Sequence, residues 1–532
     1  MAGTLRTGVV RDTDGAAIVG ARVRAIDAAG RTIGSDRAAS DGTFALDIDG
    51  EPTALEVRCA YCVTTRVIPR ADESIVVLVR RYAVLRDAPL APADLAALPY
   101  RRFAQIATLV PYVVANGSEI SDRGLGRGHG ALVLEGIPLY RATDGASRSD
   151  LIVPVALAEM FALSPLDAPR YGTYAQGGVF DVRAIGAPSA RIDGGDAFDL
   201  AARANARAIR ATYAVAGDSG GRRGDSLVAA DLPFAGGTLS ARVLALSDAD
   251  RSVAGGMLGY TTVSRRTLFS SHFAVRSSID SSLVDGAASL RSRGVIPVEF
   301  SVRAARSKGV LADGSTGTQS TQALAVGAES HGGGSDTRVA LAYERGGNEL
   351  AFNSAFVSAL TASASEYVRL GERFSVQGGM LTALRAPTLL ESESAISGDH
   401  SVLIQTRATY TDNARLRVGA VAYSERITSG RRLSGIGVDG TWQIASALAL
   451  RAWTLATSTS SDVPYPRLTL VPQNAHRQVV WFTAGEALRV DLLARGGPLE
   501  GDIRVPFGAY AATVGSSMQA GVRVTTLGIG AR

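Results

Sequence analysis

The longest part of the chain, residues 188–532, alternates apolar and polar residues in short segments. Thr238–Ser247 and Val402–Tyr410 are examples, and glycine, aspartate or serine separates one segment from the next. A period of two is typical of β-strands with one apolar face. Because no helical periodicity interrupts this region, we expect it to form one large antiparallel sheet.

These segments have the length of membrane-spanning strands, which need about 9–11 residues. Dividing roughly 345 residues among 22 strands leaves about 16 for each strand and its connection, which fits a plugged 22-stranded barrel with short connections. Only a closed barrel pairs every backbone group in lipid. We therefore predict a large antiparallel transmembrane β-barrel of about 22 strands over residues 188–532.

Two-residue turn signals locate hairpins within this region. Asn413–Ala414 separates Val402–Tyr410 from Leu416–Tyr423, and Gly346–Gly347 separates residues 336–345 from residues 349–356. Such pairs between alternating segments favour tight turns. We expect a turn at each pair.

The first 82 residues also predict strands, but these are shorter. Residues 8–15, 18–26, 41–48 and 74–79 combine alternating segments with Asp-Gly turns. Short strands at intervals of about 8–12 residues are typical of a β-sandwich. We predict a small N-terminal β-sandwich over residues 1–82.

Residues 83–187 have a different organisation. Leu85–Pro92 has the composition of a linker, and Phe103, Ile106 and Val110 have the spacing of a helix over residues 100–110. A glycine-rich stretch follows at 121–130, then short apolar strands. The region therefore predicts a small, compact α/β domain.

Composition excludes several classes of protein. The net charge is +5, and Lys308 is the only lysine. The arginines are scattered among acidic residues and form no basic patch, so we expect no nucleic-acid partner. The longest apolar stretch, Asp150–Pro165, is interrupted by Pro154 and Glu159 and is too short for a membrane-spanning helix.

The chain shows no catalytic or metal-binding pattern. Its five histidines are dispersed, and Cys59 and Cys62 have no further ligands nearby. The two cysteines are either small packed residues or a local disulfide, which would require a turn. No strand leads into the glycine-rich stretch and no Gly-Lys-Ser/Thr closes it, so it is not a phosphate loop. We expect no enzyme, metal or cofactor.

Residues 8–23 follow the pattern Gly-x-Val-x-Asp-x-x-Gly-x-x-Ile-x-Gly-Ala-x-Val, and residues 41–46 follow Asp-Gly-x-Phe-x-Leu. Both resemble the carboxypeptidase regulatory-like domain. The resemblance implies a non-catalytic interaction module. Asp12, Asp14 and Asp41 are explained by turns rather than by calcium.

Five motifs between residues 98 and 179 resemble, in order, the plug of TonB-dependent outer-membrane receptors. They are Leu98-Pro99-x-Arg101-x-Phe103-x-x-Ile106-x-x-Leu109-x-Pro111, Asp122-Arg123-Gly124, Leu132-x-Leu134-Glu135-Gly136-Ile137-Pro138-Leu139, Tyr171-Gly172 and Gly177-Gly178-Val179. The family usually has Asp where this chain has Glu135. The resemblance makes residues 83–187 a linker and plug, with Arg123, Gly124, Glu135, Gly136, Tyr171, Gly172, Gly177 and Gly178 as its motif residues.

Leu384-Arg385-Ala386-Pro387-Thr388-Leu389-Leu390-Glu391 resembles a Phe-Arg-Ala-Pro-x-x-x-Glu motif inside the barrels of the same family. Leu384 replaces the usual Phe. The resemblance makes Arg385, Pro387 and Glu391 the motif residues of the barrel.

The resemblance implies an outer-membrane receptor that takes up a metal chelate, a cofactor or an oligosaccharide. Its implied partners are a TonB-type energy-transducing protein, outer-membrane lipid and the barrel assembly machinery. The first residues show no signal-peptide pattern, Tyr82–Leu85 is a poor match to a TonB box, and aromatic residues, at 6%, are sparse for a barrel. These departures keep an alternative open, in which the same barrel is a non-transporting adhesion or scaffold protein.

Overall fold

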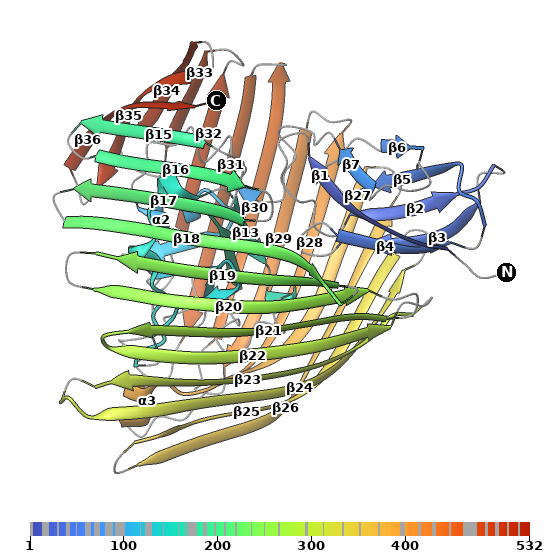
Figure 1. Ribbon diagram of the computed structural model, residues 1–532, viewed down its shortest axis with the longest axis horizontal. Helices are drawn as coiled ribbons and strands as arrows, with labels where there is room; N and C mark the ends of the chain where they lie inside the picture. The colour runs from blue at the N-terminus through green and yellow to red at the C-terminus, as the bar shows by residue number, and fades with distance from the viewer. Residues whose placement is uncertain are drawn as a thin grey trace.

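A closed antiparallel barrel of twenty-two strands, β15 to β36, dominates the computed structural model (Figure 1). Each strand pairs with the next along the chain, and β36 pairs with β15, for example Ile192 with Ile529. The predicted transmembrane-type barrel is thereby confirmed.

The structure describes residues 4–12, 21–28, 31–38, 43–48, 50–58, 65–68, 75–79, 89–90 and 102–531, the last range with short gaps and longer ones at 123–129, 168–177 and 461–475. The barrel strands are β15 (Ser189–Gly195), β16 (Phe198–Ala206), β17 (Ile209–Asp218), β18 (Gly221–Phe234), β19 (Gly237–Ser247), β20 (Ser252–Val263), β21 (Thr267–Ser278), β22 (Ser281–Ser292), β23 (Val298–Val310), β24 (Thr316–His331), β25 (Ser335–Glu349), β26 (Ser354–Leu370), β27 (Phe374–Arg385), β28 (Asp399–Asp412), β29 (Leu416–Ile427), β30 (Arg432–Ala445), β31 (Leu448–Ser460), β32 (His476–Ala484), β33 (Arg489–Ala494), β34 (Glu500–Phe507), β35 (Tyr510–Gln519) and β36 (Val522–Ala531).

The two faces of the barrel wall differ in polarity. In β29, buried and exposed residues alternate along the strand, with Arg417 and Glu425 buried and Val418 and Ala420 exposed. Around the barrel, exposed apolar side chains lie on the outward face, among them Val228, Leu258, Phe300, Leu324, Ile404 and Ile436. The wall therefore presents an apolar belt outward and carries many charged residues, such as Arg417 and Glu425, inward, as a strand period of two requires.

The space inside the barrel holds a separately folded domain, which we call the plug (Figure 1). A mixed five-stranded sheet forms its centre, in the order β12 (Ile137–Pro138), β11 (Ala131–Leu134), β14 (Val179–Arg183), β13 (Glu159–Leu163) and β8 (Pro89–Leu90). Beside it lie helix α2 (Phe103–Ala107), the hairpin β9 (Val113–Asn116) and β10 (Glu119–Asp122), and the short 3-10 turns η1 (Ser149–Leu151), η2 (Pro154–Ala156) and η3 (Pro165–Asp167).

The plug core continues into the inner wall of the barrel. Phe103 and Ile106 of α2 and Phe180 of β14 belong to one apolar cluster with Leu227 and Leu403 of the wall. The plug is therefore packed against the barrel as well as within itself.

The N-terminal strands form two sheets that share an apolar core. One has the order β4 (Thr43–Ile48), β1 (Thr4–Asp12), β7 (Ile75–Val79), and the other β3 (Thr32–Arg37), β2 (Arg22–Ile26), β5 (Ala54–Arg58), β6 (Thr65–Val67). They lie beside the end of the barrel where β18 ends and β19 begins (Figure 1). We call this the near end and the opposite one the far end.

Three expectations from the sequence need correction. β25 continues through Gly346 and Gly347 to Glu349, because both glycines pair with β24 and β26 in regular register; the chain turns later, at residues 350–353. Pro89–Leu90, within the expected linker, pairs with β13. The helix expected over residues 100–110 is shorter than expected and is α2, Phe103–Ala107. Cys59 and Cys62 lie outside the described residues.

One buried polar contact fixes the plug to the wall at the level of β30. The Tyr112 hydroxyl donates to Asp439 Oδ1 at 2.5 Å, and Arg417 and Arg407 donate to the same carboxylate at 3.0 Å each. The Tyr112 ring lies against Gly437, where an added Cβ would be 2.4 Å from its Cε1 atom. Only glycine leaves room for the ring at that position.

We expect Gly437→Ala to displace the Tyr112 ring and destabilise the seated plug by about 1–3 kcal/mol, the usual cost of overpacking. Limited proteolysis of folded protein measures this as faster cleavage within the plug. Gly440→Ala is the matched control on the same strand, because its nearest neighbour would be 3.6 Å away. Equal cleavage rates for the two variants would contradict this account of the contact.

Candidate functional site

The plug reaches the far end of the barrel with one compact loop, residues 140–150, which we call the tip. Tyr140 and Ser147 form a β-bridge, and Arg141 and Ala146 share a backbone hydrogen bond of 2.9 Å. The Asp144 carboxylate accepts from Arg141 and from the Ala146 amide. The tip is therefore held in shape by its own short-range contacts.

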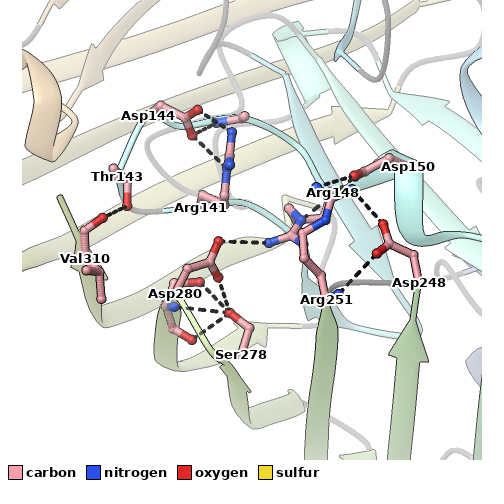
Figure 2. Close-up of polar contacts among 12 residues, drawn as sticks. Arg141, Thr143, Asp144, Arg148, Asp150, Asp248, Arg251, Ser278, Asp280 and Val310 are labelled. Atoms are coloured by element: carbon pink, nitrogen blue, oxygen red, sulfur yellow. Dashed lines mark hydrogen bonds and ion pairs between the residues drawn. The ribbon is translucent and has the colours of Figure 1, made fainter. Parts of the chain in front are cut away.

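Barrel residues at the far end hold the tip through charged groups, as Figure 2 shows. Arg148 of the tip contacts Asp280, which lies between β21 and β22, at 3.4 Å. Arg251, which precedes β20, contacts Asp150 of the tip at 2.8 Å and Asp248 at 2.6 Å. Each partner thus comes from a different pair of barrel strands.

The pKa shifts of Asp280 and Arg148 leave both groups charged. Burial tends to raise the pKa of Asp280, but hydrogen bonding from Ser278 and the charge of Arg148 outweigh it, so this pKa lies below its ordinary value. Burial lowers the pKa of Arg148, and the Asp150 and Asp280 carboxylates oppose that decrease. An arginine remains protonated under such a shift.

Tyr140, at the base of the tip, is uncharged, unlike the arginines and carboxylates around it. Burial raises the pKa of its hydroxyl to about 12, and the Asp285 carboxylate adds to the effect. The Arg276 guanidinium lies 5.7 Å from the centre of its ring and donates to the Pro138 carbonyl at 3.2 Å. The neutral tyrosine and this arginine therefore anchor the tip to β21.

The motif residues Arg385 and Glu391 form a buried ion pair at the end of β27. Both guanidinium nitrogens Nη1 and Nη2 donate to the carboxylate at 2.8 Å, and Arg385 is fully buried. Glu391 also accepts from the Thr388 amide at 2.8 Å. The pair folds the connection after β27 into helix α3 (Leu389–Glu393) and holds it against the wall.

Pro387, the third motif residue, presents its carbonyl to the neighbouring strands. Gln319 of β24 donates to it at 2.6 Å and Asn348 of β25 at 2.7 Å, and Asn348 also donates to the Thr388 carbonyl. The motif thus bridges three strands of the far end.

Helix α3 and the tip are in direct contact. The Leu390 amide donates to the Thr143 carbonyl at 2.9 Å, and the Thr143 hydroxyl donates to the Val310 carbonyl of β23 at 3.3 Å. Leu389 packs on Leu311 next to this contact. We call this meeting point of tip, α3 and β23 the far-end lock.

The plug motif Glu135-Gly136 forms the turn between β11 and β12. Both residues have positive φ, 51° and 86°. The Glu135 carboxylate accepts from the Ala184 amide at 3.0 Å and lies 3.6 Å from Arg242 Nε of the barrel. Gly178, with φ of 91°, precedes β14. Arg123, Gly124, Tyr171, Gly172 and Gly177 lie outside the described residues.

Several contact residues have no distinguishing sequence signal. Tyr112 and Asp439 are one example, and Asp225, which accepts from the Val153 amide of the plug at 2.8 Å, is another. In the sequence, Asp225 and Asp439 are single polar residues in alternating strands. The alternation tells which face they occupy but not what they contact.

No group of three or more His, Cys, Asp or Glu side chains that could hold a metal ion occurs among the described residues. In the described part of the chain, every helix is too short or too polar to cross a membrane. The far-end lock itself is made of backbone, hydroxyl and apolar groups.

The sequence matches no protein-family model, and no curated protein sequence is detectably similar to it. Solved structures, in contrast, share its fold. The FrpB iron transporter from Neisseria meningitidis (F5-1 variant) superposes with a TM-score of 0.68 at 8% identity over 84% of this chain and 100% of that one. The siderophore receptor PirA from Pseudomonas aeruginosa gives 0.64 at 14% identity, over 84% and 98%.

The alcaligin outer membrane receptor FauA from Bordetella pertussis gives 0.64 at 11% identity, over 85% of this chain and 96% of that one. The chain therefore has the plugged-barrel fold of the TonB-dependent receptors, as its motifs predict. The carboxypeptidase regulatory-like assignment of the N-terminal sheets stays a prediction.

We expect Glu391→Gln to destabilise the far end by about 3 kcal/mol, because it leaves the buried Arg385 charge without its counter-ion. The unfolding temperature of the purified barrel measures this effect. Glu393→Gln, on the exposed side of the same helix, is the matched control.

Replacing both partners, as Arg385→Met with Glu391→Leu, should recover most of the loss, since no uncompensated charge remains. A double variant whose loss is as large as that of Glu391→Gln would show that the ion pair is not the cause.

Proposed function

We propose that this protein is an outer-membrane receptor and transporter that takes up a small nutrient through its plugged barrel, energised by a TonB-type protein. The observation that carries the proposal is a separately folded plug, seated by buried polar contacts inside a closed barrel. A barrel filled in this way is sealed until the plug moves or rearranges, which is what energised uptake requires.

The apolar belt supports placement in the outer membrane. Exposed side chains such as Phe300 and Leu324, at 57% and 60% exposure, would be unfavourable over so large an area in water. In lipid they are the expected surface of a barrel.

The seam between plug and barrel supports movement. Contacts such as Asp225 to Val153 and Arg148 to Asp280 are hydrogen bonds and ion pairs, and water can replace each partner when they separate. Replacing one such intramolecular hydrogen bond by hydrogen bonds to water typically costs only about 0.5–1.5 kcal/mol. A pulling partner can therefore open such a seam in small steps.

A metal chelate is the substrate class that we favour over a cofactor or an oligosaccharide. The similar structures named above are an iron transporter, a siderophore receptor and an alcaligin receptor. Far-end connections are two to five residues long, apart from 386–398 and 461–475. Such a rim suits a small ligand in contact with the tip.

The TonB-type partner would act at the near end, where the N-terminal sheets lie (Figure 1). The weak TonB-box candidate, Tyr82–Leu85, lies outside the described residues. The proposal therefore predicts a direct complex between the purified protein and a TonB-type protein.

The far-end lock favours the alternative function, a non-transporting adhesion or scaffold protein. In that function the tip would never leave α3 and β23, and the barrel would serve only as a stable surface. Transport thus requires the far-end lock to open, whereas the scaffold function requires it to stay closed.

A disulfide across the lock distinguishes the two functions. An added Cβ at Gly309 would lie 2.7 Å from the Thr143 hydroxyl oxygen, so cysteines at both positions are close enough to bridge. We expect Thr143→Cys with Gly309→Cys, in a background with Cys59→Ser and Cys62→Ser, to stop uptake of ferric siderophores under oxidising conditions. A reductant should restore it.

Each single-cysteine variant controls for crowding at the lock, and its uptake should be the same with and without the reductant. Undiminished uptake by the fully oxidised double variant would show that the lock does not need to open. Absence of uptake by wild-type protein for every ferric siderophore, cobalamin and glycan tested would favour the scaffold function.

A further inference from the structure

The outward face of the barrel is not uniformly apolar. At the far end, exposed outward positions carry basic side chains on several strands: Arg222, Arg306, Lys308, Arg345, Arg426 and Arg432. This contrasts with the inward arginines, which face carboxylates, as Arg303 faces Asp285 and Arg417 faces Asp439. The outward cations therefore need an explanation that the plug does not provide.

Three of these cations cluster on β23 and β25. Lys308 pairs in register with Thr318 of β24, Arg306 pairs with Ser320, and Arg345 of β25 pairs with Gln322. Neighbouring strands lie about 4.8 Å apart and alternate residues of a strand about 7 Å apart, so the three cations share a surface on the order of 17 Å across. We call Arg306, Lys308, Arg345 and the three polar side chains between them the outer patch.

The cations of the outer patch are not used within the protein. Arg306 and Lys308 have no carboxylate partner among the described residues. Arg345 stacks its guanidinium 5.4 Å from the centre of the Phe356 ring, which orients it without neutralising it. Lys308 is also the only lysine of the chain. Unpaired, exposed cations beside hydroxyl and amide donors form a surface that can receive a phosphate.

The same strands are apolar immediately toward the near end. Phe300 and Val302 continue the outward row of β23, Leu324 continues that of β24, and Tyr343 that of β25, all of them about half exposed or more. Phosphate-binding groups above an apolar surface match an amphiphile, with its headgroup at the patch and its acyl chains along the belt.

We propose that the outer patch binds the phosphate groups of a phosphorylated lipid in the outer leaflet of the membrane. The proposal rests on the placement of the barrel in the outer membrane, but not on transport, because the patch faces away from the plug. Arg306, Lys308 and Arg345 supply the charge, and Thr318, Ser320 and Gln322 supply neutral donors between them. The exposed carboxylate of Glu349, opposite Thr318, limits the affinity.

Binding of diphosphoryl lipid A to the intact purified protein in neutral detergent tests the proposal, with fully dephosphorylated lipid A as the reference ligand. Wild-type protein should bind the phosphorylated lipid and not the reference. The triple variant Arg306→Gln, Lys308→Gln, Arg345→Gln should bind on the order of a hundredfold more weakly, given a factor of about five for each basic residue.

Two further variants distinguish binding at the outer patch from a general effect of the protein's positive charge. Arg222→Gln, Arg426→Gln, Arg432→Gln removes the same charge at the same end of other strands, and its affinity should stay within about threefold of wild type. Glu349→Gln should bind about fivefold more tightly, because a repelling carboxylate is removed. Equal losses in the two triple variants, or equal binding of both lipids, would overturn the proposal.

Capture of a protein instead of the lipid by wild type, and not by the first triple variant, would also overturn it. The heat-dependent gel shift of folded barrels verifies that each variant is folded. Because binding is measured on purified protein, a lack of uptake in cells would contradict the transport proposal and leave the lipid-binding proposal standing. A lack of phosphate-dependent binding would contradict the lipid-binding proposal and leave the transport proposal standing.

Discussion

Pairing of β36 with β15 decides the architecture of the barrel. It closes the sheet, so that no barrel strand presents a free edge, and it sets the number of strands at twenty-two. A barrel of that size is too wide to be filled by its own side chains. The plug follows from this constraint, since inward groups such as Asp225 and Asp439 would otherwise face a water-filled lumen.

Arginine has different roles on the inner and the outer face of the barrel wall. Inside, arginines are matched to carboxylates or backbone carbonyls, as Arg385 is to Glu391 and Arg276 is to Pro138. This matching makes burial of charge tolerable. Outside, Arg306 and Lys308 remain exposed where the belt ends. The position of an arginine, rather than its presence, therefore decides whether it holds the plug or faces the surroundings.

Much of the architecture could be predicted from the sequence, because a period of two is a local property. The strands Thr238–Ser247 and Leu416–Tyr423 are recognisable from alternation alone, and β28 ends at Asp412 and β29 begins at Leu416, on either side of Asn413–Ala414. Gly346–Gly347 was misleading, since glycine is equally compatible with a turn and with a strand that must leave room for Ala386 or Phe356.

The candidate site was predicted only in part. The motif identified Arg385, Pro387 and Glu391, but nothing near Thr143 in the sequence indicates that its carbonyl meets α3, which is about 250 residues away. Gln319 and Asn348 were missed for the same reason. Each is an ordinary polar residue of a strand, and its role depends on which segment the closed barrel brings opposite to it.

In a membrane, the intact plug should seal the closed barrel. Ion conductance in a planar lipid bilayer tests it directly, with wild-type protein compared with a variant that lacks residues 89–184. Wild-type protein should give no steady conductance, and the deletion variant should give large, stable channels. Channels of equal size from both proteins, or none from a folded deletion variant, would contradict it.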